Sequence, residues 1–104
     1  MNLPKVLADL VVAQNNADSS AYANCFSDTA VVFDEGKKHI GKVAIQKWIA
    51  KANQVYKTVM KPLEYSATEQ TLEAEISGSF PGSPLVLTYQ FELKAGQIQS
   101  LKIV

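Results

Sequence analysis

The fold is decided by residues 41–68, GKVAIQKWIAKANQVYKTVMKPLEYSAT, because the spacing of the apolar residues changes within them. As far as Val59, apolar side chains recur at helical spacing with lysines on the opposite face, which predicts the longest helix of the chain. After Pro62 they alternate with polar side chains, as in a half-buried strand. The chain therefore changes from helix to sheet here.

Before this stretch the sequence predicts two more helices. The first runs from Asn2, as N-cap, to Asn16, and the second runs from its cap Asp18 to about Phe26. Residues 27–29 are expected to form a turn, 30–33 a short strand and 35–38 a polar loop.

After Pro62, alternating patterns predict strands over 63–68, 72–80, 85–93 and 97–104, joined by turns rich in proline and glycine. Gly78 predicts a bulge or bend within the second of these strands. Helices followed by hairpin strands indicate one α+β domain over residues 1–104, a cone-shaped barrel of three N-terminal helices on a curved, mainly antiparallel sheet. Such a cone encloses an apolar pocket.

Composition excludes several functional classes. Ten lysines balance ten acidic residues, and the chain has no arginine, so it lacks the basic surplus of a nucleic-acid-binding protein and the side chain that clamps anions bidentately. No apolar run is long enough to span a membrane, and Asp9 interrupts any signal-peptide pattern, so a cytoplasmic protein is expected. One histidine and one cysteine predict no metal site, and no cofactor is expected.

A family resemblance lies in residues 22–34, YANCFSDTAVVFD, followed by His39-Ile-Gly41 and Ala44-Ile45. This pattern resembles the nuclear-transport-factor-2-like (NTF2-like) superfamily, particularly its SnoaL-like branch, which includes ketosteroid isomerase. The resemblance implies a cone-shaped fold. It leaves the function open, because such members include isomerases, dehydratases, cyclases, epoxide hydrolases and plain binding modules.

Asp34 matches the general-base aspartate of the isomerase-like members, and a carboxylate at a pocket mouth can take a proton next to a carbonyl. The alternative is a strand-end acid that hydrogen-bonds the following loop. The family's oxyanion tyrosine falls near Leu10 and its second acid near Leu87 or Thr88, so ketosteroid chemistry is not expected. Limonene-epoxide-hydrolase-like chemistry is also disfavoured, because its Asp-Arg-Asp arrangement needs an arginine that this chain lacks. His39 either pairs with Asp34, as in dehydratase-like members, or belongs to an exposed turn.

Four aromatic residues are expected to point inward, either as core or as the lining of a ligand site. The predicted ligand-binding residues are Trp48, Tyr56, Tyr65, Leu87 and Tyr89. Tyr22 is expected to pack between the short helix and the sheet, and Cys25 to be a small buried apolar residue.

Three functions remain open. The favoured one is a protein that encloses a small, mostly apolar molecule; the second is an isomerase, cyclase or dehydratase with Asp34 as general acid or base. The third is an interaction module. A homodimer is expected through the outer sheet face that carries Val86, Thr88 and Gln90.

Overall fold

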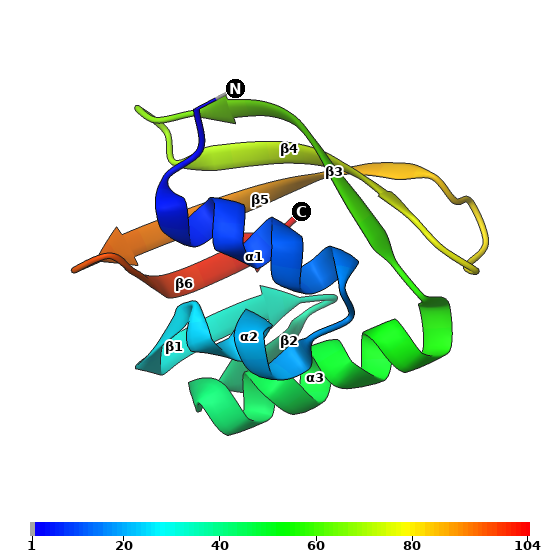
Figure 1. The fold of residues 1–104 in the computed structure, drawn as a ribbon, viewed down its shortest axis with the longest axis horizontal. Coiled ribbons are helices and arrows are strands. Elements are labelled where there is room, and N and C mark those ends of the chain that lie inside the picture. The colour runs from blue at the N-terminus through cyan, green and yellow to red at the C-terminus, as the bar shows by residue number, and fades with distance from the viewer. Residues whose placement is uncertain (1) are drawn as a thin grey trace.

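The computed structural model describes residues 2–104, which form three helices and one six-stranded sheet (Figure 1). In chain order the elements are α1 (Lys5–Asn15), α2 (Ser19–Asn24), β1 (Phe26–Asp34), β2 (Lys37–Ile40), α3 (Gly41–Tyr56), β3 (Val59–Ser66), β4 (Thr71–Ser77), β5 (Leu85–Lys94) and β6 (Gln97–Ile103). The predicted α+β class, with three N-terminal helices on a mainly antiparallel sheet, is confirmed.

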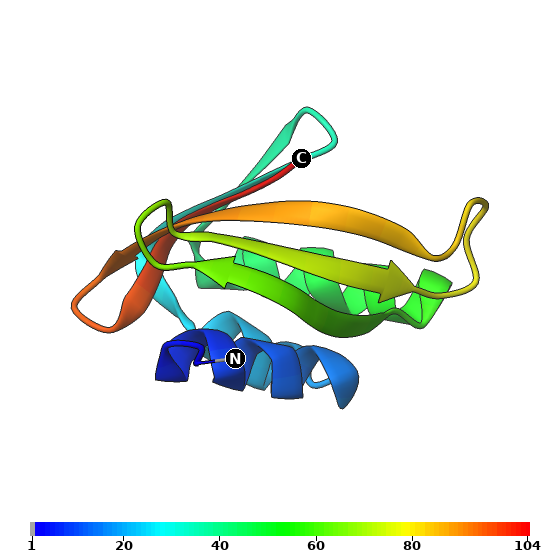
Figure 2. The same ribbon diagram turned by 90° about the horizontal axis from the view of Figure 1, so that it is seen from above.

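The strand order across the sheet is β2-β1-β6-β5-β4-β3. Only β1 and β6 are parallel, and every other neighbouring pair is antiparallel. The sheet is curved, with β1 and β2 turned away from the direction of β3 to β5 (Figure 2). Interruptions of the pairing register in β1, β3 and at the end of β5 accompany this curvature. The curved sheet and the helices together form a cone.

One contiguous core lies between the helices and the sheet. On α1 and α3 the buried residues follow single helical stripes, as the sequence pattern predicted. Each stripe ends in an amide residue, Gln14 on α1 and Asn53 on α3. The largest fully buried side chains are Phe26, Leu7, Leu10, Ile45, Leu72, Ile98, Leu101 and Val32.

The ends of two helices differ from the prediction. Pro4, rather than Asn2, occupies the N-cap position of α1, and its carbonyl oxygen accepts the backbone N–H groups of residues 7 and 8, each at 3.0 Å. The longest helix ends at Tyr56 and not near Val59. Lys57 takes a left-handed conformation there, with φ of 51°, and Val59 begins β3.

The region before the longest helix contains more strand than predicted. The second helix ends at Asn24, and residues 27–29 belong to β1 instead of a turn. Long-range contacts with β6 hold them there, including a hydrogen bond of 2.8 Å from the Ser27 hydroxyl to the Gln99 side chain. The expected polar loop is a tight hairpin, because only Glu35 and Gly36, with φ of 51° and 75°, form its turn before β2 begins.

Gly78 does not form a bulge within a strand, because β4 ends at Ser77. Instead the glycine lets the β4–β5 loop approach the end of α3: a Cβ atom at residue 78 would lie 2.6 Å from the carbonyl oxygen of Tyr56. The backbone N–H of Ser79 donates to that same oxygen at 2.7 Å. The bulge lies in β3, between Pro62 and Glu64, and it leaves Leu63, which the alternation placed inward, 41% exposed.

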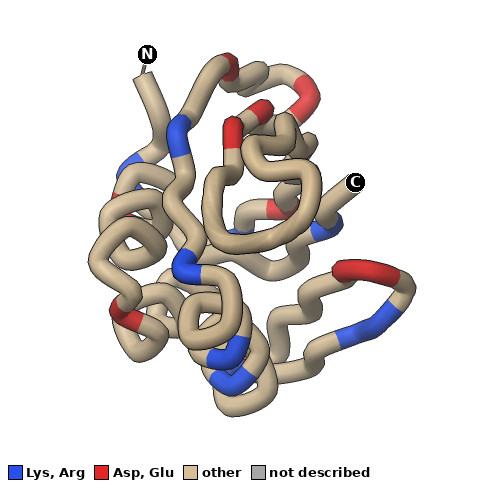
Figure 3. Tube along the Cα trace, turned by 90° about the vertical axis from the view of Figure 1, so that its right-hand side faces the viewer, with Lys and Arg blue, Asp and Glu red and all other residues tan. Residues whose placement is uncertain are grey.

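Charged residues of both signs are interspersed along the chain, and the β4–β5 loop carries none (Figure 3). Within residues 2–104 no helix is long and apolar enough to cross a membrane.

Candidate functional site

A cavity of about 340 Å³ lies between α3, the N-terminal helices and the sheet. Its floor is formed by buried residues and its rim by exposed ones. The floor comprises Gln14, Tyr22, Ile49, Met60, Ile76 and Tyr89, and the exposed rim comprises Glu35, Tyr56, Pro81 and Leu85. Half-buried residues that include Asp34, Trp48 and Leu87 complete the wall. The volume suits a small organic molecule, and the wall is mostly apolar.

Asp34 is the last residue of β1 and directly precedes the tight hairpin turn, so the sheet fixes its backbone. Its half-buried carboxyl lines the cavity. Burial raises the pKa of this carboxyl above its usual range, and the negative charge of Glu35 raises it further. Hydrogen bonding from Trp48 and the charge of His39 oppose that rise. A carboxyl with a raised pKa is suited to exchange protons near neutral pH.

Trp48 connects the two residues that the sequence singled out for chemistry. It lines the cavity together with Asp34, and its ring stacks on that of His39, with ring centroids 5.4 Å apart and planes inclined by 27°. His39 itself is half-buried on β2 and is not part of the cavity wall. The histidine therefore supports the indole that contacts Asp34.

Two buried tyrosines line the same cavity as Asp34 and come from different elements. Tyr22 comes from α2 and Tyr89 from β5, and both line the cavity. Burial raises the pKa of each phenol, well above its ordinary value for Tyr22, and the charge of Asp34 adds to both shifts. Both phenols therefore stay protonated at physiological pH, and each has an O–H group able to donate a hydrogen bond. Within residues 2–104 neither hydroxyl takes part in a hydrogen bond with another residue.

A triangle of polar side chains lies at the floor, where α1, α3 and β3 meet. Gln14 Nε2 donates to Asn53 Oδ1 at 2.9 Å and to the hydroxyl of Thr58, and that hydroxyl donates to Asn53 Oδ1 at 3.1 Å. Among the described residues, Gln14 Oε1 and Asn53 Nδ2 are buried without a partner. An unpaired buried polar group typically costs about 1–3 kcal/mol.

The structure brings together most of the residues proposed for the site. Asp34, Trp48, Tyr56, Leu87 and Tyr89 line one cavity. Tyr65 is not part of the wall; it packs against the core from the part of β3 beyond the bulge.

Tyr22 and Gln14 are among the cavity residues that sequence reasoning did not propose. Tyr22 was expected to be packing alone, although it also contacts the cavity. Gln14 was not singled out, although a signal existed: a polar amide continues the apolar stripe of Leu7 and Leu10. At Leu10, where the family tyrosine was expected, the side chain is fully buried core.

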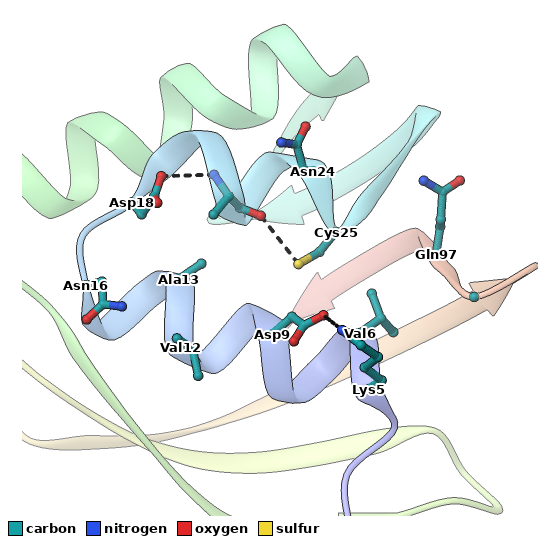
Figure 4. A pocket seen from close by; sticks show the side chains of 12 residues that line it. Lys5, Val6, Asp9, Val12, Ala13, Asn16, Asp18, Asn24, Cys25 and Gln97 are labelled. Atoms are coloured by element: carbon teal, nitrogen blue, oxygen red, sulfur yellow. Dashed lines mark hydrogen bonds and ion pairs between the residues drawn. The ribbon is translucent and has the colours of Figure 1, made fainter.

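A second hollow, of about 630 Å³, lies on the surface between α1, α2 and the turn before β6 (Figure 4). Two of its charged side chains, Lys5 and Asp9, pair at 2.7 Å, and Asp18 caps α2 by accepting the N–H of Ala21 at 3.0 Å. Cys25 lies at its base, buried as predicted, and burial raises the pKa of the thiol. This hollow is larger, but Asp34 and the buried tyrosines line the other cavity, which is therefore the candidate site.

Within residues 2–104 no group of three or more His, Cys, Asp or Glu side chains is placed to hold a metal ion. The groups available for chemistry in the cavity are thus one carboxyl with a raised pKa, two protonated phenols and a buried amide triangle. Together they can move a proton and donate hydrogen bonds to an oxygen that becomes negatively charged.

Comparison with known proteins gives the same architecture. No family model and no curated protein matches the chain. Among solved structures, a candidate polyketide cyclase from Sinorhizobium meliloti is 38% identical and superimposes with a TM-score of 0.91, over 98% of this chain and 95% of that one.

Two more distant structures share the fold. A Catenulispora acidiphila protein with a ketosteroid-isomerase-like fold, in complex with trimethylamine, is 18% identical, with a TM-score of 0.85 over 99% of this chain and 86% of that one. An NTF2-like protein of unknown function from Cytophaga hutchinsonii is 11% identical, with a TM-score of 0.77 over 100% of this chain and 90% of that one.

Proposed function

The chain belongs to the SnoaL-like family of the NTF2-like fold, which includes the candidate cyclase, and on that premise we propose that its cavity binds a small, mostly apolar carbonyl compound. Asp34 then acts as general base and acid on that compound, in an isomerisation or a ring closure. This proposal joins the two leading expectations from the sequence, a pocket for an apolar molecule and acid–base chemistry at Asp34.

The observation that carries the proposal is the environment of the Asp34 carboxyl. It lines an apolar cavity, its pKa is raised mainly by burial, and two protonated phenols lie close enough for its charge to affect their pKa values. An aspartate that only hydrogen-bonds the loop after its strand would need neither an adjoining cavity nor neighbouring phenols.

The chemical step follows from these groups. The Asp34 carboxylate removes a proton from the carbon next to the carbonyl; the C–H bond breaks, and its electron pair moves onto the carbonyl oxygen, which becomes an enolate. A phenol, Tyr22 or Tyr89, donates a hydrogen bond to that oxygen. The protonated Asp34 returns its proton to another carbon in an isomerisation. In a ring closure the enolate carbon attacks a second carbonyl of the same molecule, and Asp34 protonates the new alkoxide.

General-base catalysis typically raises a reaction rate about 10²–10⁴-fold, and one hydrogen-bond donor to the oxyanion raises it about 10²–10³-fold. Phenols from α2 and β5 therefore replace the family donors that the sequence showed to be missing at Leu10 and Leu87. The description of the relative from Sinorhizobium meliloti as a candidate polyketide cyclase supports ring closure as the reaction class.

The test uses 2-tetralone, a bicyclic ketone with acidic protons next to its carbonyl. Binding is followed by NMR titration, and deuterium uptake at those carbons is followed in D₂O. We expect binding by the unaltered protein and exchange faster than in buffer. Asp34→Asn is expected to keep the binding and lose the exchange by about 10²-fold or more.

Asp28→Asn is the matched control, because Asp28 lies on the same strand with a side chain 92% exposed, where it pairs with Lys42 at 3.6 Å. This variant should exchange at the unaltered rate. Binding with no exchange above buffer in any variant would leave a binding protein and overturn the catalytic part. No binding would overturn the ligand class.

A further inference from the structure

Aromatic rings are concentrated around the cavity of Asp34. The chain has four phenylalanines, four tyrosines and one tryptophan, and five of these nine residues line the cavity. The five are Tyr22, Trp48, Tyr56, Phe80 and Tyr89. The proposed reaction uses the hydroxyl groups of Tyr22 and Tyr89 as donors to the carbonyl oxygen, and it gives no role to the faces of the rings.

The rings of these residues meet at steep angles. Those of Tyr22 and Trp48 are inclined by 60°, with centroids 6.2 Å apart. Those of Tyr56 and Phe80 meet edge to face, at 89° and with centroids 6.0 Å apart. Each pair therefore forms a corner and not a flat stack. Because the face of an aromatic ring carries partial negative charge, a cavity with such corners can contact a cation from more than one side.

The charged side chains in the wall of the cavity are both acidic. Asp34 and Glu35 lie at the end of β1 and in the turn that follows, and within residues 2–104 none of the ten lysines lines the cavity. The nearby Lys38 lies over the ring of Phe33, with its Nζ 5.6 Å from the centroid, and both residues, like His39, are outside the wall. An anionic ligand would therefore meet two carboxyl groups and no counter-charge, whereas a cationic ligand is attracted by both.

The rings and the carboxyl groups together select one kind of cation. Rings alone would suit a neutral apolar ligand equally well, so the acidic charge decides in favour of a cation. A primary ammonium is compact and strongly hydrated, and it loses hydrogen bonds to water when it enters a mostly apolar cavity. A methylated ammonium keeps the charge and replaces N–H groups by methyl groups, which pack against aromatic rings. It is the group that fits both features of the wall.

We propose that this cavity recognises a methylated ammonium group on its carbonyl ligand. The inference rests on the proposed function at Asp34, which supplies the carbonyl, and it narrows the ligand class to ketones that carry such a cation. The aromatic rings contact the methyl groups, and the carboxylates of Asp34 and Glu35 balance the charge. The cation also stabilises the enolate that forms in the same molecule.

The test compares two ketones of the same shape, the N,N-dimethyl-4-oxopiperidinium ion and 4,4-dimethylcyclohexanone. They differ in one atom, a positively charged nitrogen in place of a carbon, and this nitrogen has no N–H to donate. NMR titration at neutral pH gives both dissociation constants. We expect the unaltered protein to bind the cation about tenfold more tightly, the gain typical of a cation held by ring faces away from water. Glu35→Gln and Tyr56→Leu should each reduce this ratio by about two- to fivefold.

Each variant has a matched control. Glu69→Gln removes the charge of an exposed glutamate in another hairpin turn, and Phe33→Leu removes an exposed ring on β1. Neither residue is part of the cavity wall. Both control variants should therefore keep the full preference for the cation.

The outcomes separate this inference from the function of Asp34. Equal affinities, or tighter binding of the neutral ketone, would overturn the inference and leave the function of Asp34 standing. A ratio that stays unchanged in both Glu35→Gln and Tyr56→Leu would do the same, because the cation would then be held elsewhere. Failure of both ketones to bind, while 2-tetralone binds, would also overturn the inference alone. If 2-tetralone fails to bind as well, the proposed function is overturned with it.

Discussion

At the level of single residues, Asp34 links stability to pH. Folding raises the pKa of its carboxyl, so the native state holds this proton more tightly than the unfolded chain does. The contribution of this group to stability is therefore fully present below the unfolded pKa of about 4 and is lost as the pH rises through the higher native pKa. At neutral pH the ionised carboxylate destabilises the fold.

Asp34→Asn is accordingly expected to be more stable than the unaltered protein at pH 7. The difference should shrink as the pH falls and vanish below about 4, where Asp34 is protonated in both the native and the unfolded state. Urea denaturation at a series of pH values measures it. A variant that is less stable at neutral pH would mean that Asp34 holds its loop and does not serve the cavity.

Individual residues show what sequence can and cannot reveal about the site. Asp34 and Tyr89 could be proposed from pattern and resemblance, because a strand-end acid and an inward aromatic are local features. Gln14 left a local signal, as an amide in an apolar stripe. Its hydrogen bonds could not be predicted, because Asn53 and Thr58, which accept from its amide nitrogen, meet it only in the tertiary fold, from 39 and 44 residues away.

At the level of elements, the docking of α1 on β3 depends on Asn15. Its side chain makes two hydrogen bonds to the backbone of Met60, in the manner of a neighbouring strand. Asn15→Ala should lower the free energy of unfolding by about 1–3 kcal/mol, at about 0.5–1.5 kcal/mol for each bond. Urea denaturation measures this loss, and Asn16→Ala, at the exposed next residue, should change stability by less than about 0.5 kcal/mol. Equal effects of the two substitutions would contradict this account.

The contact between α3 and the β4–β5 loop sets the rim of the cavity. Gly78→Ala would place a Cβ atom 2.6 Å from the carbonyl oxygen of Tyr56, so either the loop or the end of the helix must move. We expect a loss of about 1–3 kcal/mol, as for other overpacked sites. Thermal unfolding measures it, with Ser77→Ala as the control that adds no atom. Unchanged stability of Gly78→Ala would show that the loop is free to separate from α3.

Elements were predictable where their pattern was local. The longest helix and the strands after residue 62 follow from apolar periodicity, and the turns at 81–84 and 95–96 from glycine and proline. The full extent of β1 and the existence of β2 could not be predicted. β1 is held by parallel pairing with β6, which lies more than sixty residues later in the chain. The hairpin turn between β1 and β2 was also missed because Glu35 takes a positive φ, a conformation that is unusual for glutamate.

For the whole molecule, the change from helical to strand period was enough to predict the α+β class. The cone was predicted from the family resemblance and from a bend at Gly78, and the structure places the register interruptions elsewhere. The volume and polar floor of the cavity depend on side chains that meet only after folding. The expected homodimer stays a prediction. The outer sheet face presents Val86, which is 60% exposed, beside the exposed Gln90. Sedimentation at tens of micromolar should give twice the chain mass of 11.3 kDa, and Val86→Glu should shift the protein towards the monomer. A monomer at that concentration would contradict the prediction.

The central claim, that Asp34 transfers a proton of a ligand in the cavity, is tested most directly by the pH dependence of deuterium uptake into 2-tetralone. We expect a protein-dependent rate that rises with pH as one group ionises, with an apparent pKa above the ordinary value of about 4 for aspartate. This rise should be absent in Asp34→Asn and unchanged in Asp28→Asn. A protein-dependent rate that keeps the same pH profile in Asp34→Asn would contradict the claim.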